Sequence, residues 1–336
     1  MADYDSRFTG FWTDTLDANN RVEALLQAGD ITQDEATQLQ HFILDGYVVL
    51  PNAITPDLAD SIAYEMSHVY EHSDKFVART ERQGYNLATR DVVESRFMRL
   101  IDYYVNSTLA REAAFCPKIT RFLRLIFERG VMAFQSLSFT VGSQQHMHQD
   151  GAYVVLSEPI QFAASWIALQ DVEEGTGELE YFPGSHRWPD FLFSGEFKHW
   201  KPARDGQEQL HAYYAYLYEV AEKRGVQPQR FLPKKGDALI WAADLAHGGS
   251  RITKPEATRR SLVTHYCPED VLPNYAQETK IFYKKPAGIE NCFYSARHYD
   301  LRPIMDKPGE TLRSPAGEIL RMIERVKSET AQLTAE

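Results

Sequence analysis

The stretch His148-Gln149-Asp150 organises this 336-residue sequence, together with His247 in the later run His247-Gly248-Gly249. In a β-strand, residues i and i+2 project to the same side, so an H-x-D on a strand points an imidazole and a carboxylate at one place. Two histidines and one carboxylate on one face of a metal ion leave its other coordination positions open for further ligands. We therefore expect His148, Asp150 and His247 to bind a metal ion.

His146 is the competing candidate for the histidine ligand, because it would lie on the same strand face as His148. The alternative role for His146 is packing, or a hydrogen bond that orients a ligand without touching the metal.

The sequence around these residues has the period-two pattern of β-strands, interrupted by Gly and Pro turns. Short strands separated by such turns are typical of a sandwich or barrel. The strands that we expect are Ala133–Phe139, Ala152–Leu156, Gln161–Leu169, Glu178–Phe182, Ala238–Trp241 and Arg259–Cys267.

Several motifs occur in an order that resembles the phytanoyl-CoA dioxygenase family of Fe(II)/2-oxoglutarate oxygenases, over roughly residues 36 to 270. The resemblance implies a mainly β fold with helical decoration (α+β), built on a double-stranded β-helix core of the jelly-roll, cupin-like type. Besides the triad, the motifs are Ala133–Phe139, Trp166, Gly175–His186, Lys235–Trp241 and Arg259–Tyr266.

The resemblance also implies the cofactors: Fe(II), 2-oxoglutarate and O2. In the family, 2-oxoglutarate takes two of the three open metal positions and O2 takes the third. Succinate and CO2 are released, and the substrate loses a hydrogen and usually gains a hydroxyl group. Relatives that halogenate carry a small residue in place of the carboxylate ligand, so Asp150 favours hydroxylation. No catalytic residue beyond the metal site is expected.

Arg259 is the candidate partner for the far carboxylate of 2-oxoglutarate. A guanidinium binds a carboxylate through two parallel hydrogen bonds, which Lys cannot make. Arg259 lies 12 positions after His247 and shares a strand face with Ser261, an R-x-S pairing familiar in this superfamily. Arg260 would then face outward, and a register shift of one residue would exchange the two arginines.

Two more residues are candidates for the cosubstrate site. Trp166 lies 18 positions after His148, where relatives place a tryptophan on the cosubstrate, although plain core packing is an equal alternative. Gln135 could donate to the cosubstrate or face a neighbouring polar group. The sequence departs from the family where relatives often carry Ser two residues after the distal histidine. Gly249 stands there, with Ser250 next, which predicts a local loop change.

The chain reads as an N-terminal arm and one oxygenase domain, because no segment has the composition of a linker. Within the domain, a charged stretch at 75–100 fits a solvated loop better than a lid. The aromatic insert, which contains Tyr213, Tyr214 and Tyr216, is expected to frame the substrate site together with 75–100, or simply to pack. The expected parts are 1–30 (arm), 31–130 (mostly helical, with one helix at about 107–128), 131–270 (jelly roll, with the insert at 190–230) and 271–336 (extension, with a final helix at about 315–333).

The composition disfavours two classes of binding partner. A formal net charge of −11 disfavours nucleic acid and anionic membranes, which bind basic surfaces. The three cysteines, Cys116, Cys267 and Cys292, do not form a disulfide framework. With no signal peptide and no membrane-spanning run, we expect a cytoplasmic protein. The partner expected is a small-molecule substrate, and the apolar stripe of the final helix leaves a homo-oligomer open.

The function that these features favour is hydroxylation of an unactivated C–H bond of a small molecule. One alternative is a non-catalytic cupin-like protein that binds a metal or ligand. Another is a metalloenzyme that does not use 2-oxoglutarate. An acyl-CoA would need a basic groove, which the net charge disfavours without excluding a local patch. A secondary metabolite, an amino-acid derivative and a small polar acid are equally open as substrates.

Overall fold

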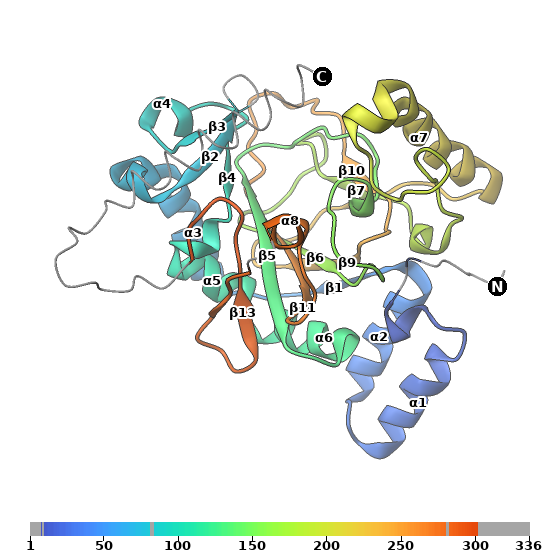
Figure 1. Cartoon of the computed structure of the whole chain (residues 1–336). Helices are drawn as coiled ribbons and strands as arrows, with labels where there is room; N and C mark the ends of the chain where they lie inside the picture. The colour runs from blue at the N-terminus through green and yellow to red at the C-terminus, as the bar shows by residue number, and fades with distance from the viewer. Residues whose placement is uncertain (1–7, 9, 81–83, 280–281, 302–336) are drawn as a thin grey trace.

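The computed structural model describes Phe8 and residues 10–80, 84–279 and 282–301. Short helices of the N-terminal third surround the β core (Figure 1). They are α1 (Ala18–Ala28), α2 (Gln33–Asp45), α3 (Pro56–His68), α4 (Arg90–Val93), α5 (Thr108–Ala114) and α6 (Pro117–Phe127). The short 3-10 helices are Trp12–Asp14, Val69–Lys75, Tyr103–Val105, Asp150–Ala152 and Ser185–Arg187.

Helix α2 shows how local sequence sets the boundaries of these elements. The Thr32 side chain accepts a hydrogen bond from the Glu35 backbone, and the Glu35 side chain accepts one from the Thr32 backbone. This reciprocal cap satisfies two N–H groups that the first helical turn leaves without partners. Gly46 ends the helix at φ 80°, a conformation that glycine adopts at little cost, and strand β1 starts at the next residue.

The core consists of two antiparallel sheets that face each other as a jelly roll, which confirms the predicted fold class. The larger sheet runs in the order β1-β9-β6-β11-β5-β4-β2-β3, and the smaller runs β10-β7-β8. The strands of the larger path are β1 (Tyr47–Leu50), β9 (Ala238–Ala242), β6 (Ala163–Ala168), β11 (Ser261–Pro268), β5 (Val131–Phe139), β4 (Arg99–Ile101), β2 (Val77–Thr80) and β3 (Gly84–Leu87). The smaller sheet contains β10 (His247–Gly249), β7 (Leu179–Tyr181) and β8 (Gln229–Phe231).

The remaining elements cover the sheets. Helix α7 (Pro202–Arg224) belongs to the insert and buries Leu210, Tyr213 and Leu217 in one cluster with Phe182 beyond β7. The C-terminal part contributes α8 (Asn274–Thr279), β12 (Lys285–Pro286) and β13 (Cys292–Tyr294). Strand β13 runs parallel to β5, next to the start of that strand. Figure 1 shows α8 in front of β5 and α7 beside β7 and β10.

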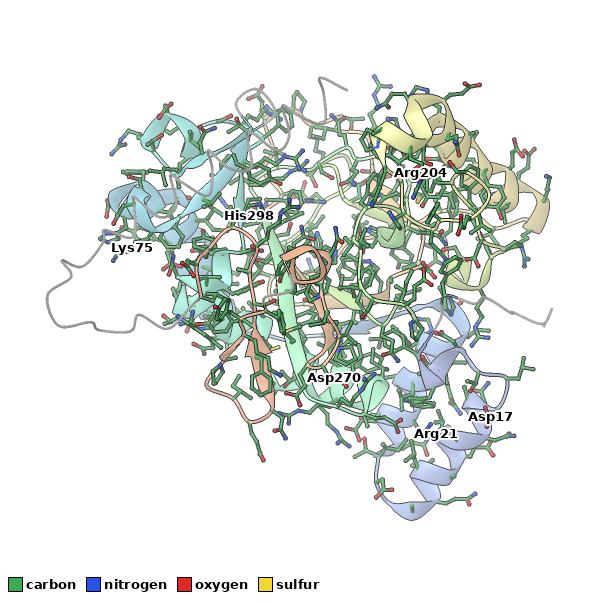
Figure 2. The ribbon with its side chains drawn as sticks, in the orientation of Figure 1. Asp17, Arg21, Lys75, Arg204, Asp270 and His298 are labelled. Carbon is green, nitrogen blue, oxygen red and sulfur yellow. The ribbon has the colours of Figure 1, made fainter. Side chains whose placement is uncertain are left out.

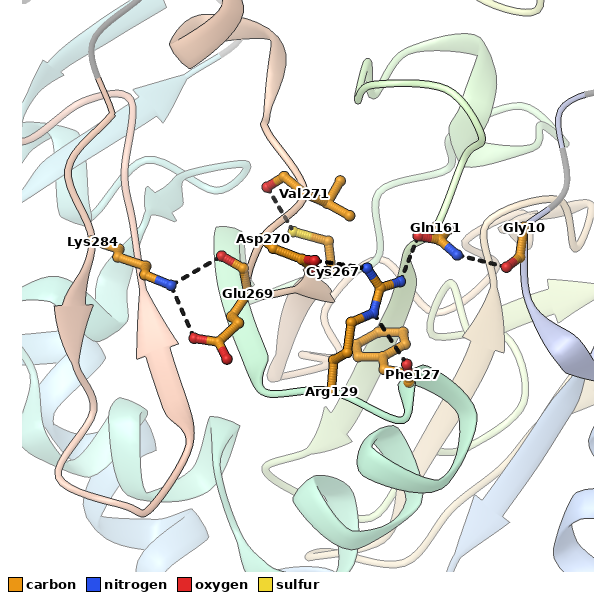
Figure 3. A network of polar contacts seen from close by, with 9 residues as sticks. All are labelled: Gly10, Phe127, Arg129, Gln161, Cys267, Glu269, Asp270, Val271 and Lys284. Atoms are coloured by element: carbon orange, nitrogen blue, oxygen red, sulfur yellow. Dashed lines mark hydrogen bonds and ion pairs between the residues drawn. The ribbon is translucent and has the colours of Figure 1, made fainter.

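A polar network ties Gly10 and Lys284 to the segments next to the core strands (Figure 3). Arg129 donates to both carboxylate oxygens of Asp270, at 2.8 and 3.0 Å, and to the Gln161 side chain. Gln161 in turn donates to the Gly10 carbonyl at 2.6 Å. Lys284 holds Glu269 at 2.9 Å on the other side. These contacts fix the segments that precede β6 and follow β11, the two strands that flank the site.

Three local predictions were wrong. The stretch 75–100 is not an open loop, because β2, β3 and β4 extend the larger sheet there. The helix predicted at about 107–128 is two helices, since Pro117 cannot continue α5 and begins α6. No strand forms at 152–156; these residues leave a 3-10 turn and make a single bridge, Leu156 to Pro273.

Other expectations stay predictions. The final helix at about 315–333 lies outside the described residues, and the division into an arm and one domain is not tested, although Ala18–Ala28 within the arm is helical. Among the described helices, none is long and apolar enough to cross a bilayer. The cytoplasmic location, the absence of a nucleic-acid partner and an oligomeric state also stay predictions.

Gly46→Ala should destabilise the fold by about 2–5 kcal/mol. The positive φ alone costs about 1–2 kcal/mol, and the new Cβ would lie 2.5 Å from Nδ1 of the buried His186 ring, adding overpacking of about 1–3 kcal/mol. The measurement is the free energy of unfolding in urea. Gly29→Ala is the control, since Gly29 also ends a helix at φ 78° but has open space around it. Equal losses in the two variants would show that the His186 contact is unimportant.

Candidate metal centre

Three buried side chains converge between the two sheets. Ligand atoms of His148, Asp150 and His247 all lie within 4.8 Å of one another. The Nε2 atoms of both histidines are 3.6 Å from the same oxygen of Asp150, Oδ1. The sequence-predicted metal ligands are therefore brought together, and among the described residues they form the one such group of three.

The backbone, rather than a regular strand, brings these residues together. His148 and His247 exchange two backbone hydrogen bonds of 2.8 Å, which form an isolated antiparallel bridge. The Asp150 N–H donates to the Ala243 carbonyl, and a 3-10 turn begins at Asp150. The expectation of an H-x-D on one strand was thus wrong in its local structure. The pairing of this segment with β10 is limited to the single residue pair His148 and His247, because the chain turns at Asp150.

The two glycines after His247 allow this close pairing. A Cβ at Gly248 would lie 2.8 Å from the Gln145 carbonyl oxygen, and one at Gly249 would lie 2.8 Å from the Gln144 nitrogen. Side chains there would push the segment before His148 away from β10. Glycine at both positions therefore permits the close approach of this segment to β10.

Hydrogen bonds orient both imidazoles. His148 Nδ1 lies 2.7 Å from the His146 carbonyl, and His247 Nδ1 lies 2.9 Å from the Leu245 carbonyl. A carbonyl can only accept, so Nδ1 carries the proton in each ring, and Nε2 keeps its lone pair. The Gln145 side-chain amide lies 3.1 Å from His148 Nε2, where it can donate to that lone pair. Both free nitrogen atoms face Asp150.

Protonation states at the centre suit a metal cation. Burial lowers the pKa of His247 to about 4, so the ring is neutral at pH 7. Burial alone would raise the pKa of Asp150, but the neighbouring His247, His265 and His148 hold it well below its usual range. Neutral imidazoles and an ionised carboxylate are the forms that bind a metal. Two nitrogens and one oxygen also match the donor set of a non-haem iron site.

The second carboxylate oxygen of Asp150 faces two residues that sequence reasoning did not assign to the site. Trp241 Nε1 donates to Oδ2 at 2.9 Å, and His265 Nε2 lies 3.4 Å from the same oxygen. The signal for His265 was strand parity: it alternates onto the same face of β11 as Ser261 and Val263. Both ring nitrogens of His265 are buried without a hydrogen bond in the described part of the chain.

His146 does not join the triad. Its ring stacks on Tyr214 at 4.8 Å and is exposed, while its carbonyl accepts from His148.

Arg259 lies just before β11, and its side chain is buried inside the core. Its Nη1 donates to the Gly177 carbonyl at 2.8 Å, and Nη2 lies 3.5 Å from the Ser261 hydroxyl. The guanidinium is 5.2 Å from the ring of Trp166. Its Nε has no hydrogen-bond partner, and no carboxylate lies within ion-pair distance of it in the described residues. Burial lowers the pKa of Arg259 to about 10, still above neutral pH.

The other predicted cosubstrate residues line the same inner face. Trp166 on β6 lies opposite Val263 of β11 and packs beside the Arg259 guanidinium. A contact between Trp166 and the cosubstrate stays a prediction. Gln135 on β5 lies opposite His265 and is half-buried, and its side chain makes no hydrogen bond within the described part of the structure. Arg260 alternates away from this face, and its N–H donates to the Gln170 side chain.

Over residues 42–261 the sequence matches the phytanoyl-CoA dioxygenase (PhyH) family. The chain belongs to this family.

Solved structures share the fold of this PhyH-family protein at low sequence identity. The epimerase SnoN from nogalamycin biosynthesis is 16% identical, with a TM-score of 0.53 over 84% of this chain and 92% of its own. SnoN in complex with Fe3+, alpha ketoglutarate and nogalamycin RO gives the same identity and TM-score, over 84% and 93%. The carbocyclase SnoK from the same biosynthesis is 15% identical, with a TM-score of 0.54 over 76% and 92%. These likenesses bear on the fold alone.

The aromatic insert of the PhyH-family protein reaches the triad. The hydroxyl oxygens of Tyr214 on α7 and Tyr153 are 2.5 Å apart, and the centroids of the Tyr153 and His148 rings are 5.4 Å apart. Tyr213 is buried, and its hydroxyl accepts from the Gln149 N–H. Tyr216 instead donates to the Pro189 carbonyl. Of the three tyrosines singled out from the sequence, Tyr214 lies beside the site and the other two pack.

Replacing any triad residue with Ala should weaken metal binding by more than about 100-fold, beyond the 10–100-fold typical of groups that only orient a ligand. The measurement is Fe(II) or Co(II) affinity under anaerobic conditions. His146→Ala is the matched control and should bind metal like the wild type, since only its carbonyl contacts the centre. Loss of binding in His146→Ala but not in His148→Ala would reverse the assignment.

Proposed function

We propose that this protein is an Fe(II)/2-oxoglutarate-dependent oxygenase that hydroxylates an unactivated C–H bond of a small molecule. Membership of the PhyH family supports the oxygenase class. The observation that carries the proposal is a pair of features on one inner face. These are a three-ligand metal centre and a buried guanidinium that lacks a carboxylate partner among the described residues.

Arg259 is the group that separates this proposal from a simple metal-binding protein. Burying a cation costs several kcal/mol unless an anion is paired with it. Its Gly177 and Ser261 contacts fix the orientation of the guanidinium but bring no negative charge. The far carboxylate of 2-oxoglutarate would supply that charge through paired hydrogen bonds. A non-catalytic metal binder, or a metalloenzyme without 2-oxoglutarate, has no use for this cation.

When bound, Fe(II) with 2-oxoglutarate and O2 supplies the oxidising chemistry, with release of succinate and CO2. The residues of this chain position the reactants. His148, Asp150 and His247 hold the metal from one side, and Arg259 with Ser261 holds the cosubstrate. Trp166 packs on the guanidinium, and Gln135 has an amide free to donate toward the cosubstrate. Trp241 donates to Asp150 Oδ2 and His265 lies beside that oxygen, so that Oδ1 faces His148 and His247.

The outcome of the reaction is the finer part of the proposal. Asp150 occupies the ligand position that halogenating relatives leave small, which supports hydroxylation. The two similar structures named above are an epimerase and a carbocyclase by title, so one fold hosts several outcomes. Product analysis by mass spectrometry distinguishes them: hydroxylation adds one oxygen atom, whereas epimerisation leaves the mass unchanged.

Arg259→Ala should weaken 2-oxoglutarate binding by about 30-fold or more, since loss of one partner of a buried charge pair costs about 2–5 kcal/mol. The measurement is the weak visible charge-transfer band of the Fe(II)/2-oxoglutarate chelate, titrated without oxygen. Arg260→Ala is the control and should keep wild-type affinity, because Arg260 alternates to the other face of the strand. The absence of a band in wild-type protein that holds iron would sink the oxygenase proposal.

His265→Phe should lower metal affinity by about 10–100-fold and shift the chelate band, because Asp150 Oδ2 loses one of its two neighbours and can turn toward the metal. His265→Asn should restore much of the affinity, since its amide can donate to the same oxygen. If His265→Phe acted only by loosening the fold, His265→Asn would not restore the wild-type position of the chelate band. Equal spectra for Phe, Asn and wild type would remove His265 from the site.

A further inference from the structure

The aromatic insert contributes a buried lysine that reaches the segment before His247. Lys198 is 5% exposed, and its ammonium donates to Oδ2 of Asp244 at 2.8 Å and to Oδ1 of Asp190. Asp244 is 6% exposed and lies between the end of β9 and the start of β10. The ion pair between Lys198 and Asp244 therefore joins the insert to the segment that leads into the candidate metal centre.

The backbone on either side of Asp244 contacts two members of the triad. The Ala243 carbonyl accepts a hydrogen bond of 2.9 Å from the Asp150 N–H. The Leu245 carbonyl lies 2.9 Å from Nδ1 of His247 and fixes the orientation of that ring. A shift of the Asp244 backbone would therefore move both contacts, and with them the two ligand side chains.

The same ion pair packs on the chain next to Asp150. A Cβ at Gly151 would lie 3.1 Å from Oδ1 of Asp244 and 3.6 Å from Cγ of Lys198. On the other side of Asp150, the Gln149 side chain donates to the Asp244 carbonyl at 2.7 Å. Lys198 and Asp244 thus lie where the two ligand-bearing segments meet.

Stability alone does not account for this ion pair. Buried charges lose hydration that their mutual attraction often fails to return, and apolar residues of similar volume commonly give an equally stable protein. The second carboxylate oxygen of Asp244, Oδ1, is buried without a hydrogen-bond partner in the described part of the chain, which adds a further cost. The contacts of Asp244 with the ligand-bearing segments offer a reason for keeping the pair.

We propose that Lys198, acting through Asp244, is a positioning residue for the metal centre. Lys198 holds the Asp244 side chain, and the backbone around Asp244 then orients Asp150 and His247. Neither Lys198 nor Asp244 touches the metal or the substrate in this role. The proposal rests on the metal centre of the function proposed above, but it does not depend on 2-oxoglutarate. It gives the insert a part in metal binding besides packing and framing the substrate site.

The test measures Co(II) binding by the full-length protein without oxygen or 2-oxoglutarate, together with the visible Co(II) spectrum, which depends on ligand geometry. Lys198→Met and Asp244→Ala should each weaken Co(II) binding by about 10-fold and change the spectrum. Asp244→Asn should recover most of the affinity, because its amide oxygen can still accept from Lys198. A double variant that combines Lys198→Met with Asp244→Ala should lose no more than the larger single loss, since the two residues act through one contact.

Asp205→Ala is the matched control, because Asp205 is another buried, ion-paired aspartate of the insert. Its hydrogen-bond partners in the described chain are Ser194, Lys201 and Arg204, all within the insert. Arg204 is labelled beside α7 in Figure 2. Asp205→Ala should lower the free energy of unfolding in urea, as Asp244→Ala should, but it should keep the wild-type Co(II) affinity and spectrum.

Unchanged Co(II) affinity in Lys198→Met and Asp244→Ala would overturn the proposal. An equal loss in Asp205→Ala would also overturn it, because any loosening of the insert would then weaken the metal site. If Lys198→Met does not fold, Asp244→Ala decides, since Lys198 keeps Asp190 as its partner there.

The outcome in the wild type separates this proposal from the proposed function. No Co(II) binding by the wild type would sink both. Co(II) binding that weakens in Lys198→Met and Asp244→Ala, in a protein that shows no Fe(II)/2-oxoglutarate band, would sink the oxygenase function and leave Lys198 as a positioning residue of a metal-binding protein.

Discussion

His148 and His247, 99 positions apart, exchange two backbone hydrogen bonds of 2.8 Å, and the geometry of the candidate metal centre follows from this bridge. The bridge joins the segment after β5 to the start of β10. Each imidazole is then fixed by a carbonyl two residues before it, so both Nε2 atoms face Asp150. Asp150 is in turn attached to the Ala243 carbonyl. Backbone contacts therefore hold the three side chains in place. A metal ion would bind with little further ordering of the chain.

The inner face of the larger sheet is shaped by small and aromatic residues in alternation. Ala164 lies opposite His265, and Ala168 lies opposite Ser261. Their small side chains leave room for the His265 imidazole near Asp150 and for the Ser261 hydroxyl near Arg259. Trp166 lies between these two alanines on β6 and is beside the guanidinium. Trp241 of β9 lies opposite Ala164 and is beside the carboxylate. A buried cation and a buried anion thus share one face, each next to an indole.

The convergence of the triad and the place of Arg259 beside Ser261 could be predicted from sequence, because ligand type and residue spacing are local properties. Contacts between distant segments were not accessible in the same way. The bridge that positions His148 depends on β10, and the pairing that makes β2 and β4 strands depends on β5. Their charged residues, such as Arg79, suggested a solvated loop, since charged positions break the apolar pattern that is usual on a strand. His265 was missed because a histidine inside an apolar strand reads as packing.

Buried charge without a protein partner is the strongest physical argument for a ligand in this fold. A guanidinium taken out of water loses several kcal/mol of hydration, and the Arg259 side chain makes only two hydrogen bonds within the described chain, both to neutral groups. Arg99, on the same phenylalanine ring, makes that burial less favourable still. A protein selected only for stability would replace Arg259 with an apolar residue of similar volume. The presence of Arg259 on the face that carries the candidate metal ligands is best explained by an anion that binds during function.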